Sequence, residues 1–214
     1  MAEVRDWHVA ALAEITGRPA SEIRRRLGNG GISLTEEQSQ AMEERGAERE
    51  RLHFLAAAEK GDFATAVSRL GSTAVANGIV YLDEEYGLTP DDARDLLREH
   101  WTRCDAPGDV TEDLLVLFLR AGYVSDCDER PTGELTVYRG TFGDDPRLGI
   151  SWTLDKSKAE WFAAQGGRGS GRVRNEQTVW RGTVSATAIL GYFIEREEAE
   201  VILDPTTVHD VTLV

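Results

Sequence analysis

The chain has 214 residues, of which 41% are hydrophobic, enough for one good core or for one domain with a smaller partner. Its 38 acidic and 24 basic residues give a formal net charge of -14, and most of the acidic excess falls in residues 1–130. Such an acidic surface disfavours long-range attraction to nucleic acid or to an anionic membrane.

The chain carries two cysteines, Cys104 and Cys127, and four histidines that are scattered along it. This pattern predicts neither a disulfide scaffold nor a metal site, because both need grouped ligands. The first 16 residues contain three acidic side chains, so they lack the basic start and apolar run of a secretion signal. No stretch approaches the length of a membrane span. We therefore expect a cytoplasmic protein that uses no metal and makes no membrane contact.

Residues 1–124 are predicted to be a helical region. Thr35 begins a capping-box pattern, and Thr89 is followed by a proline and two aspartates, which favour the first turn of a helix. Apolar residues then recur at steps of three and four, which predicts apolar helical faces over residues 93–104 and 114–119.

The helical pattern stops near residue 124, and the polar residues 125–134 are predicted to be a connector between two domains. After the connector the pattern changes to short strands, interrupted by one helix that begins at Asp155. This order indicates an α+β domain over residues 135–214 with a mostly antiparallel sheet. The predicted strands are residues 135–139, 149–153, 178–184, 187–194, 200–203 and 208–214.

Arg139 lies at the end of the first predicted strand. Side chains alternate between faces along a strand, so Leu135, Val137 and Arg139 are expected on one face, with the guanidinium at the edge of the core. A guanidinium in this place suits a phosphate or carboxylate partner, and an arginine that simply extends into water is the alternative. On the next strand Ser151 and Thr153 are expected to share a face, a pattern that is common on half-buried strands.

Glu198 and Glu200 lie immediately before the apolar run 201–203. In a regular strand both carboxylates would point to one face, about 6–7 Å apart. Two partly desolvated carboxylates titrate separately, so one can stay ionised while the other is poised for base chemistry. The alternative is a solvated acidic turn, because residues 195–197 are all charged.

Taken in order, these segments resemble the three motifs of the mono-ADP-ribosyltransferases of the arginine, serine, glutamate group. The resemblance covers residues 134–214. It implies an ADP-ribosyltransferase-like fold for this part of the chain and NAD as the co-substrate. The segments are Tyr138-Arg139-Gly140, Ser151-Trp152-Thr153 and Glu198-Ala199-Glu200, and the implied contacts to NAD come from Arg139, Gly140, Ser151, Trp152, Thr153 and Glu200.

The resemblance also implies catalytic roles. Arg139 would contact the phosphates or the nicotinamide ribose of NAD, and Ser151 and Thr153 would steady the nicotinamide pocket. Glu200 would be the catalytic acid, since loss of nicotinamide leaves an oxocarbenium-like ribose that a fixed carboxylate stabilises. Glu198 would act on the acceptor. In the family a glutamate at this position accompanies arginine acceptors, so the resemblance implies an arginine of a target protein.

Two further regions bear on the same interpretation. The glycine-rich residues 165–171 are similar to the loop that folds over the dinucleotide in such enzymes, and no contact is assigned to Arg168. The strand region is short for this fold, so helices within residues 90–121 are expected to complete the catalytic domain. The acidic region 1–124 matches no motif, and an antitoxin or chaperone is a candidate partner for it.

Three alternatives stay open. With water as the acceptor the protein would be an NAD glycohydrolase, which the motifs do not separate from a transferase. A catalytically silent interaction module of the same fold is disfavoured by the intact Arg139, Ser151 and Glu200. Nucleic acid is the third alternative, as acceptor or as partner, because residues 10–27 suggest two helices joined by a turn, with three consecutive arginines at 24–26. The acidic surroundings argue against it.

Overall fold

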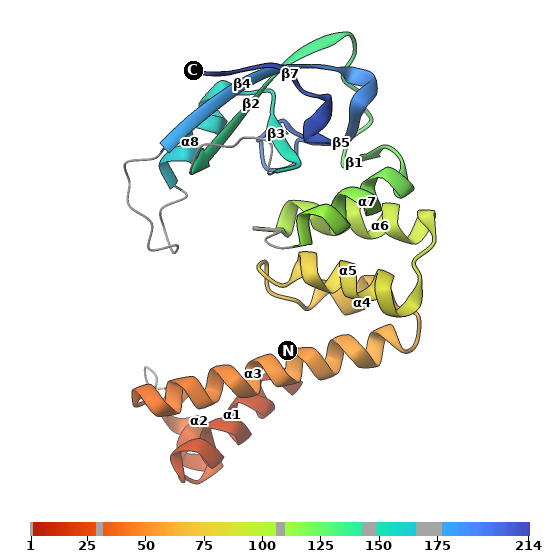
Figure 1. Cartoon of the computed structure of the whole chain (residues 1–214). Coiled ribbons are helices and arrows are strands. Elements are labelled where there is room, and N and C mark those ends of the chain that lie inside the picture. The colour runs from red at the N-terminus through yellow and green to blue at the C-terminus, as the bar shows by residue number, and fades with distance from the viewer. Residues whose placement is uncertain (1, 29–31, 106–109, 143–148, 166–176) are drawn as a thin grey trace. The chain divides into compact units, whose positions relative to one another are not determined.

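A computed structural model describes the chain except for residues 1, 29–31, 106–109, 143–148 and 166–176. The contacts within the chain divide it into an N-terminal unit, Met1–Asp62, and a C-terminal unit, Phe63–Val214. Figure 1 colours the chain from red at its N-terminus to blue at its C-terminus. Among the described residues, none of the helices combines the length and the apolar character needed to span a membrane.

The N-terminal unit contains the helices α1 (Ala2–Thr16), α2 (Ala20–Gly28) and α3 (Glu36–Ala58). The predicted capping box at Thr35 is confirmed, because its hydroxyl accepts from the backbone N–H of Gln38 at 3.2 Å and the Gln38 side chain accepts from the backbone N–H of Thr35 at 3.1 Å. Apolar side chains from α1 and α2 form a small core, whose buried members are Val9, Leu12 and Ile23.

Several helices of the C-terminal unit precede its sheet in the chain. The cap predicted at Thr89 is confirmed, since its hydroxyl accepts from the backbone N–H of Asp92 at 3.1 Å. The apolar faces predicted for these helices are buried. Examples are Leu96 and Leu97 on one helix and Leu114 and Leu117 on another. The helices are α4 (Phe63–Ser68), α5 (Val75–Tyr86), α6 (Pro90–His100), the 3-10 turn η1 (Trp101–Arg103) and α7 (Thr111–Ala121).

The described part of the C-terminal unit has a seven-stranded, mostly antiparallel sheet, so the predicted α+β class and the antiparallel sheet are confirmed. The strand order is β1-β5-β6-β3-β2-β4-β7, and only the pair β1–β5 is parallel. The strands are β1 (Val124–Ser125), β2 (Glu134–Phe142), β3 (Ser151–Thr153), β4 (Gln177–Ser185), β5 (Ile189–Phe193), β6 (Glu200–Leu203) and β7 (His209–Leu213).

The division between the units is not at residues 125–134, where the sequence predicted a connector; it falls between Asp62 and Phe63. Strand β1 extends into the expected connector and pairs with β5, and the Asp126 carboxylate accepts the backbone N–H of Glu195 at 2.8 Å and that of Ile194 at 3.0 Å. The polar composition of this segment therefore reflects hydrogen bonding to the sheet. It could not be separated from a solvated linker by composition alone.

Helices α6 and α7 belong to the same unit as the sheet because aromatic side chains join them. Trp101, in η1, packs edge-on against Phe118 of α7 with ring centroids 5.0 Å apart, and lies 6.4 Å from the ring of Phe193 in β5. Aromatic contacts of this kind add to the gain from burying the rings. The expectation that helices within residues 90–121 complete the domain that contains the sheet agrees with this arrangement.

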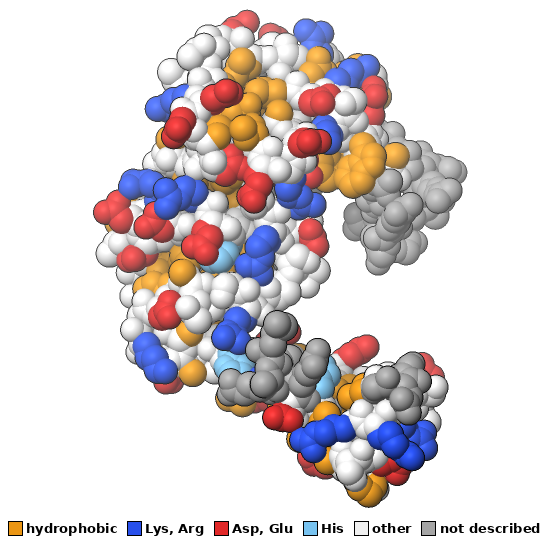
Figure 2. All heavy atoms as spheres, turned by 180° about the vertical axis from the view of Figure 1, so that it is seen from behind, with side chains coloured by type: hydrophobic (Ala, Val, Ile, Leu, Met, Phe, Trp, Pro, Cys, Tyr) orange, Lys and Arg blue, Asp and Glu red, His pale blue; other side chains and the backbone are white. Residues whose placement is uncertain are grey.

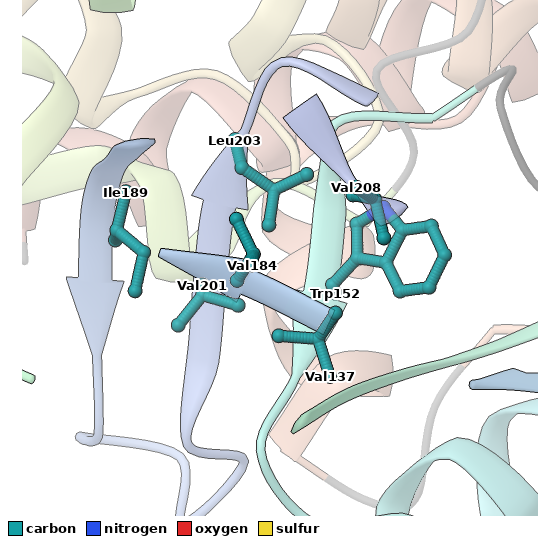
Figure 3. Close-up of a cluster of buried hydrophobic side chains, with 7 residues drawn as sticks. All are labelled: Val137, Trp152, Val184, Ile189, Val201, Leu203 and Val208. Carbon is teal, nitrogen blue, oxygen red and sulfur yellow. The ribbon is translucent and has the colours of Figure 1, made fainter. Parts of the chain in front are cut away.

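One face of the sheet carries a cluster of buried apolar side chains, which Figure 3 shows in close-up. The side chains come from β2, β3, β4, β5 and β6 and from the residue before β7, so the cluster ties together strands that are far apart in sequence. Burying side chains of this size stabilises the fold by about 1.5–3 kcal/mol each. The cluster consists of Val137, Trp152, Val184, Ile189, Val201, Leu203 and Val208.

Helix α8 (Lys156–Gln165) packs on β2 and β4, as Figure 1 shows. Gly140 permits the close approach. A Cβ atom at Gly140 would lie 2.1 Å from the carbonyl oxygen of Ala159 and 2.7 Å from the backbone nitrogen of Ala163, both in α8. Because both contacts are with backbone atoms, any larger residue would push the helix away from the strand.

Candidate active site

One cleft in the C-terminal unit has a volume of about 410 Å³ and is lined by all the residues that the sequence pointed to as a site. Strand β3 lies between β2 and β6, so three neighbouring strands bring these residues together. Residues that follow α6 also line the cleft. The predicted site residues are Arg139, Gly140, Ser151, Trp152, Thr153, Glu198 and Glu200.

Glu200 is the first residue of β6 and lies opposite Thr153 of β3. The Ser151 hydroxyl donates to its Oε1 at 2.5 Å. Burial raises the pKa of Glu200 to about 7, and the charge of Glu198 adds to this effect, while hydrogen bonds from Ser151 and Trp101 and the charge of Arg196 oppose it. The carboxyl group is therefore poised to change its charge near neutral pH.

Glu198 does not lie on the strand, which begins only at Glu200. The expectation of two carboxylates on one face of a regular strand is wrong, because the residues on either side of Glu198 adopt left-handed backbone conformations. The φ angles are 56° at Glu197 and 43° at Ala199. Such angles strain a non-glycine residue, and they persist only where the surroundings fix them.

Hydrogen bonds from β3 fix this turn. The Thr153 hydroxyl donates to the carbonyl oxygen of Glu198 at 2.5 Å, and the backbone N–H of Leu154 donates to the carbonyl oxygen of Ala199 at 3.0 Å. Ser151 and Thr153 share a face, as predicted, and each hydroxyl meets a different part of the Glu198–Glu200 segment. The two hydroxyls thus hold the acidic segment in position, which the sequence pattern could not reveal.

Arg139 does not extend into water. Its Nη1 donates to the carbonyl oxygen of Ser151, and its guanidinium lies where a Cβ atom at Gly149 would be only 1.9 Å from Nη2. Its Nε is buried and has no hydrogen-bond partner among the described residues. Burial lowers the pKa of Arg139 and the charge of Glu200 opposes this, yet a guanidinium keeps its proton in proteins. The cleft therefore has a desolvated cation beside Glu200.

Trp152 and Gly140 have structural roles that the resemblance did not imply. The Trp152 side chain is 2% exposed and belongs to the apolar cluster of Figure 3, and its indole N–H donates to the carbonyl oxygen of Gly149 at 3.2 Å. Gly140 is the crossing point of β2 and α8. Both residues line the cleft, but these contacts explain them through packing.

The sequence interpretation did not identify several residues of the cleft. Trp101, Thr102 and Asp105, which follow α6, line it, and so does Arg196, from the turn before β6. Gly149 is required by the guanidinium that lies against it. The apolar spacing of residues 93–104 had indicated that Trp101 is buried. Nothing in the pattern indicated that it faces Glu200, since that depends on how the helices meet the sheet.

Two further predictions concern metal ligands and attraction to nucleic acid. Among the described residues, no group of three or more His, Cys, Asp or Glu side chains is placed to hold a metal ion. On the face that Figure 2 shows, acidic and basic side chains of the described residues are interspersed. In the N-terminal unit, Arg24 pairs with Asp6 at 3.0 Å and Arg26 with Glu22 at 2.9 Å. These pairs reduce the charge that α2 offers to nucleic acid.

The glycine-rich segment expected to cover the dinucleotide lies outside the described residues, apart from Gln165 at the end of α8. Comparisons of the chain with protein-family models, with curated proteins and with solved structures found no match. The geometry of the cleft, together with the three motifs that line it, is therefore what a functional assignment has to explain.

Proposed function

We propose that this protein is a mono-ADP-ribosyltransferase, which cleaves the N-glycosidic bond of NAD, releases nicotinamide and transfers ADP-ribose to an acceptor. The observation that carries the proposal is the Glu200 carboxyl group, which accepts a hydrogen bond from the Ser151 hydroxyl at 2.5 Å. The same cleft contains the guanidinium of Arg139, whose Nε is buried. An acid and a cation placed in this way match the two needs of NAD, a charge-stabilising group for its ribose and a positive charge for its phosphates.

Glu200 is suited to the ribose. When the C1′–N bond breaks, its electron pair leaves with nicotinamide and positive charge develops on the ribose ring. A fixed carboxylate stabilises that charge, and desolvation strengthens the interaction. Because burial raises the pKa of Glu200 to about 7, the group is ionised above neutral pH. The Ser151 hydroxyl fixes its orientation.

Arg139 is suited to an anionic or hydroxyl-rich part of the same molecule. Its guanidinium is held by the carbonyl oxygen of Ser151, and its Nε is unpaired within the described protein. A buried cation without a carboxylate hydrogen bond is costly for a fold, and such costs concentrate at binding sites. A phosphate or the nicotinamide ribose of NAD would supply acceptors for it.

Glu198 is suited to the acceptor because it precedes the strand and has a side chain that is still 16% exposed. Its carboxylate can take the proton of an incoming nucleophile while the new bond to C1′ forms. An arginine side chain of a target protein is the favoured acceptor, since its guanidinium pairs well with a carboxylate. Water as the acceptor would make the protein an NAD glycohydrolase.

The decisive experiment measures nicotinamide release from labelled NAD in the presence of cell lysate. It compares the wild-type protein with Glu200→Gln and with the control Glu197→Gln. Glu197 is an exposed glutamate of the same turn and does not line the cleft. We expect Glu200→Gln to lower release by about 100-fold or more, because it removes the charge that stabilises the ribose, and we expect Glu197→Gln to leave it unchanged.

The position of the label distinguishes the alternatives. Label in protein supports a transferase, label in nucleic acid would overturn the protein acceptor, and free ADP-ribose alone would identify a glycohydrolase. Absence of nicotinamide release by the wild-type protein in every lysate would contradict the proposal, and an interaction module would then be the better interpretation.

A further inference from the structure

Arg196 is a cleft residue to which the three motifs assign no role. It lies in the turn between β5 and β6, two residues before Glu198, and its side chain is 45% exposed. Its Nη1 donates to the carbonyl oxygen of Thr102 at 2.7 Å and lies 3.9 Å from Oδ1 of Asp105. Its Nε lies 3.4 Å from Oε1 of Glu198.

Arg196 places its guanidinium against the carboxylate of Glu198. In the proposed function this carboxylate binds the acceptor and takes its proton. Glu198 has only a small part of its side chain exposed, 16%, so its open side offers room for few partners. An acceptor arginine would present the same chemical group to the same oxygen atoms. Arg196 therefore has the chemistry of the favoured acceptor and already contacts its carboxylate.

The anchors of Arg196 on its other side decide how firmly it is held. Thr102 and Asp105 both come from the segment after α6, so these contacts are separate from the contact with Glu198. That contact is a partly exposed ion pair at 3.4 Å, a type that contributes little to stability and exchanges readily.

We infer that Arg196 occupies the place of the acceptor guanidinium on Glu198 in the resting protein, so that an arginine acceptor binds by displacing it. This inference rests on the proposed function and concerns the acceptor half of the reaction. Arg196 is a specificity-determining residue in this scheme. The apparent affinity for a guanidino acceptor is then the intrinsic affinity multiplied by the fraction of molecules in which Glu198 is not paired with Arg196.

Kinetic constants distinguish competition by Arg196 from a purely structural role of this residue. An internal competitor raises the KM for the acceptor and leaves the KM for NAD and the rate at saturating acceptor unchanged. A residue needed only for the shape of the turn would change all of these together, because Glu198 and Glu200 share that turn. The difference between the two KM values is therefore the informative measurement.

The test uses agmatine, a small guanidino compound, as the acceptor and follows both nicotinamide release and ADP-ribosyl-agmatine. It compares the full-length wild-type protein with Arg196→Gln, Arg196→Lys and a control, Arg98→Gln. Arg98 is an arginine of α6 that forms an exposed ion pair with Asp95 at 3.2 Å and does not line the cleft. Measurements near pH ~8.5 keep Glu200 ionised in every variant.

We expect Arg196→Gln to lower the KM for agmatine by about two- to fivefold, with the KM for NAD and kcat within about twofold of the wild type. Arg196→Lys keeps a cation in this place, so its KM for agmatine should stay near the wild-type value. Arg98→Gln should behave as the wild type. Melting curves show that each variant is folded.

An unchanged or increased KM for agmatine in Arg196→Gln would overturn the inference. So would a parallel loss of all activities in both Arg196 variants, because this is the signature of a structural role. If no variant modifies agmatine while nicotinamide is still released, the inference fails, NAD cleavage stands, and the labelled-lysate experiment decides between a transferase with another acceptor and a glycohydrolase. Absence of nicotinamide release from the wild-type protein would overturn both.

Discussion

Both units of the chain carry exposed ion pairs, but the described part of the C-terminal unit also has charged side chains desolvated within a cleft. In the described part of the N-terminal unit the ion pairs are solvent-accessible. Arg45, for example, donates to both carboxylate oxygens of Glu14 at 2.7 Å, and the two side chains are 40% and 69% exposed. In the C-terminal unit Arg139 and Glu200 are desolvated within a cleft, and Nε of Arg139 has no partner among the described residues. Exposed pairs contribute little to stability, whereas desolvated charges cost stability and are retained where they bind or react.

The apolar cores of the two units also differ, in how far apart in sequence their members lie. The buried cluster in the N-terminal unit consists of Val9, Leu12 and Ile23, all from two neighbouring helices. The cluster in the C-terminal unit joins strands that are distant in sequence, as Figure 3 shows. A core of the second kind can offset the cost of desolvated charges. The contrast predicts that substitutions at the cleft of the C-terminal unit change activity, and that those in the N-terminal unit change stability alone.

After Glu200→Gln, the largest effect on activity is expected from Gly149→Ala. A Cβ atom at this position would lie 1.9 Å from Nη2 and 2.2 Å from Cζ of Arg139, so the guanidinium has to move away from the carbonyl oxygen of Ser151. We expect kcat/KM for nicotinamide release to fall by about 100-fold, because a shift of about 1 Å in a positioning group has effects of this size.

The matched control for that variant lies in the N-terminal unit. Gly46 is within α3, and a Cβ atom added there would meet nothing within 4 Å. Gly46→Ala should leave nicotinamide release unchanged and raise stability by about 0.5–1 kcal/mol, because alanine is the better helix former. Equal activity of Gly149→Ala and the wild type would show that the position of Arg139 is not critical.

The second prediction concerns stability and pH. Because burial raises the pKa of Glu200 from 4.5 to about 7, the folded protein keeps this proton between these pH values while the unfolded chain loses it. The stability that the protonated group supplies is complete below pH 4.5 and is lost as the pH rises through 7. Glu200→Gln removes this dependence.

The free energy of unfolding of Glu200→Gln minus that of the wild type is therefore expected to be larger at pH ~8 than at pH ~4.5. The increase is on the order of 3 kcal/mol. Urea unfolding of both proteins at the two pH values measures the change. Comparing the differences cancels any constant effect of the substitution, such as an altered hydrogen bond with Ser151. The same difference at both pH values would show that Glu200 is not desolvated in the folded protein.

The smallest expected effect tests the core of the N-terminal unit. Ile23 is fully buried there, and Ile23→Val removes one methylene group. We expect a loss of about 0.5–1.5 kcal/mol in the stability of this unit, measured by denaturant unfolding, and no change in nicotinamide release under native conditions. A fall in nicotinamide release would break the contrast between the units, since it would connect the N-terminal unit to the reaction.

Most of the regular elements could be predicted because their signals are local. Thr35 and Thr89 cap helices through side chains three residues away, and the strand from Glu134 to Phe142 has the alternation expected around Val137. Strand β1 was missed, because it has only two residues and exists through its pairing with β5. The turn at Glu198 stayed an alternative to a regular strand, since its two left-handed residues are not glycines and are held by Thr153 and Leu154.

The sequence by itself determined the α+β class, the mostly antiparallel sheet and the set of motif residues that meet in one cleft. The class and the sheet follow from periodicity and capping, which are read along the chain, and the set of residues follows from the resemblance of the ordered motifs to those of a known family. Only the tertiary structure decided that α4 and α5 share a unit with the sheet, that Ser151 holds Glu200 and that Arg196 reaches Glu198. The reason is physical, since desolvation and side-chain pairing depend on which elements pack together, and sequence spacing alone does not specify that packing.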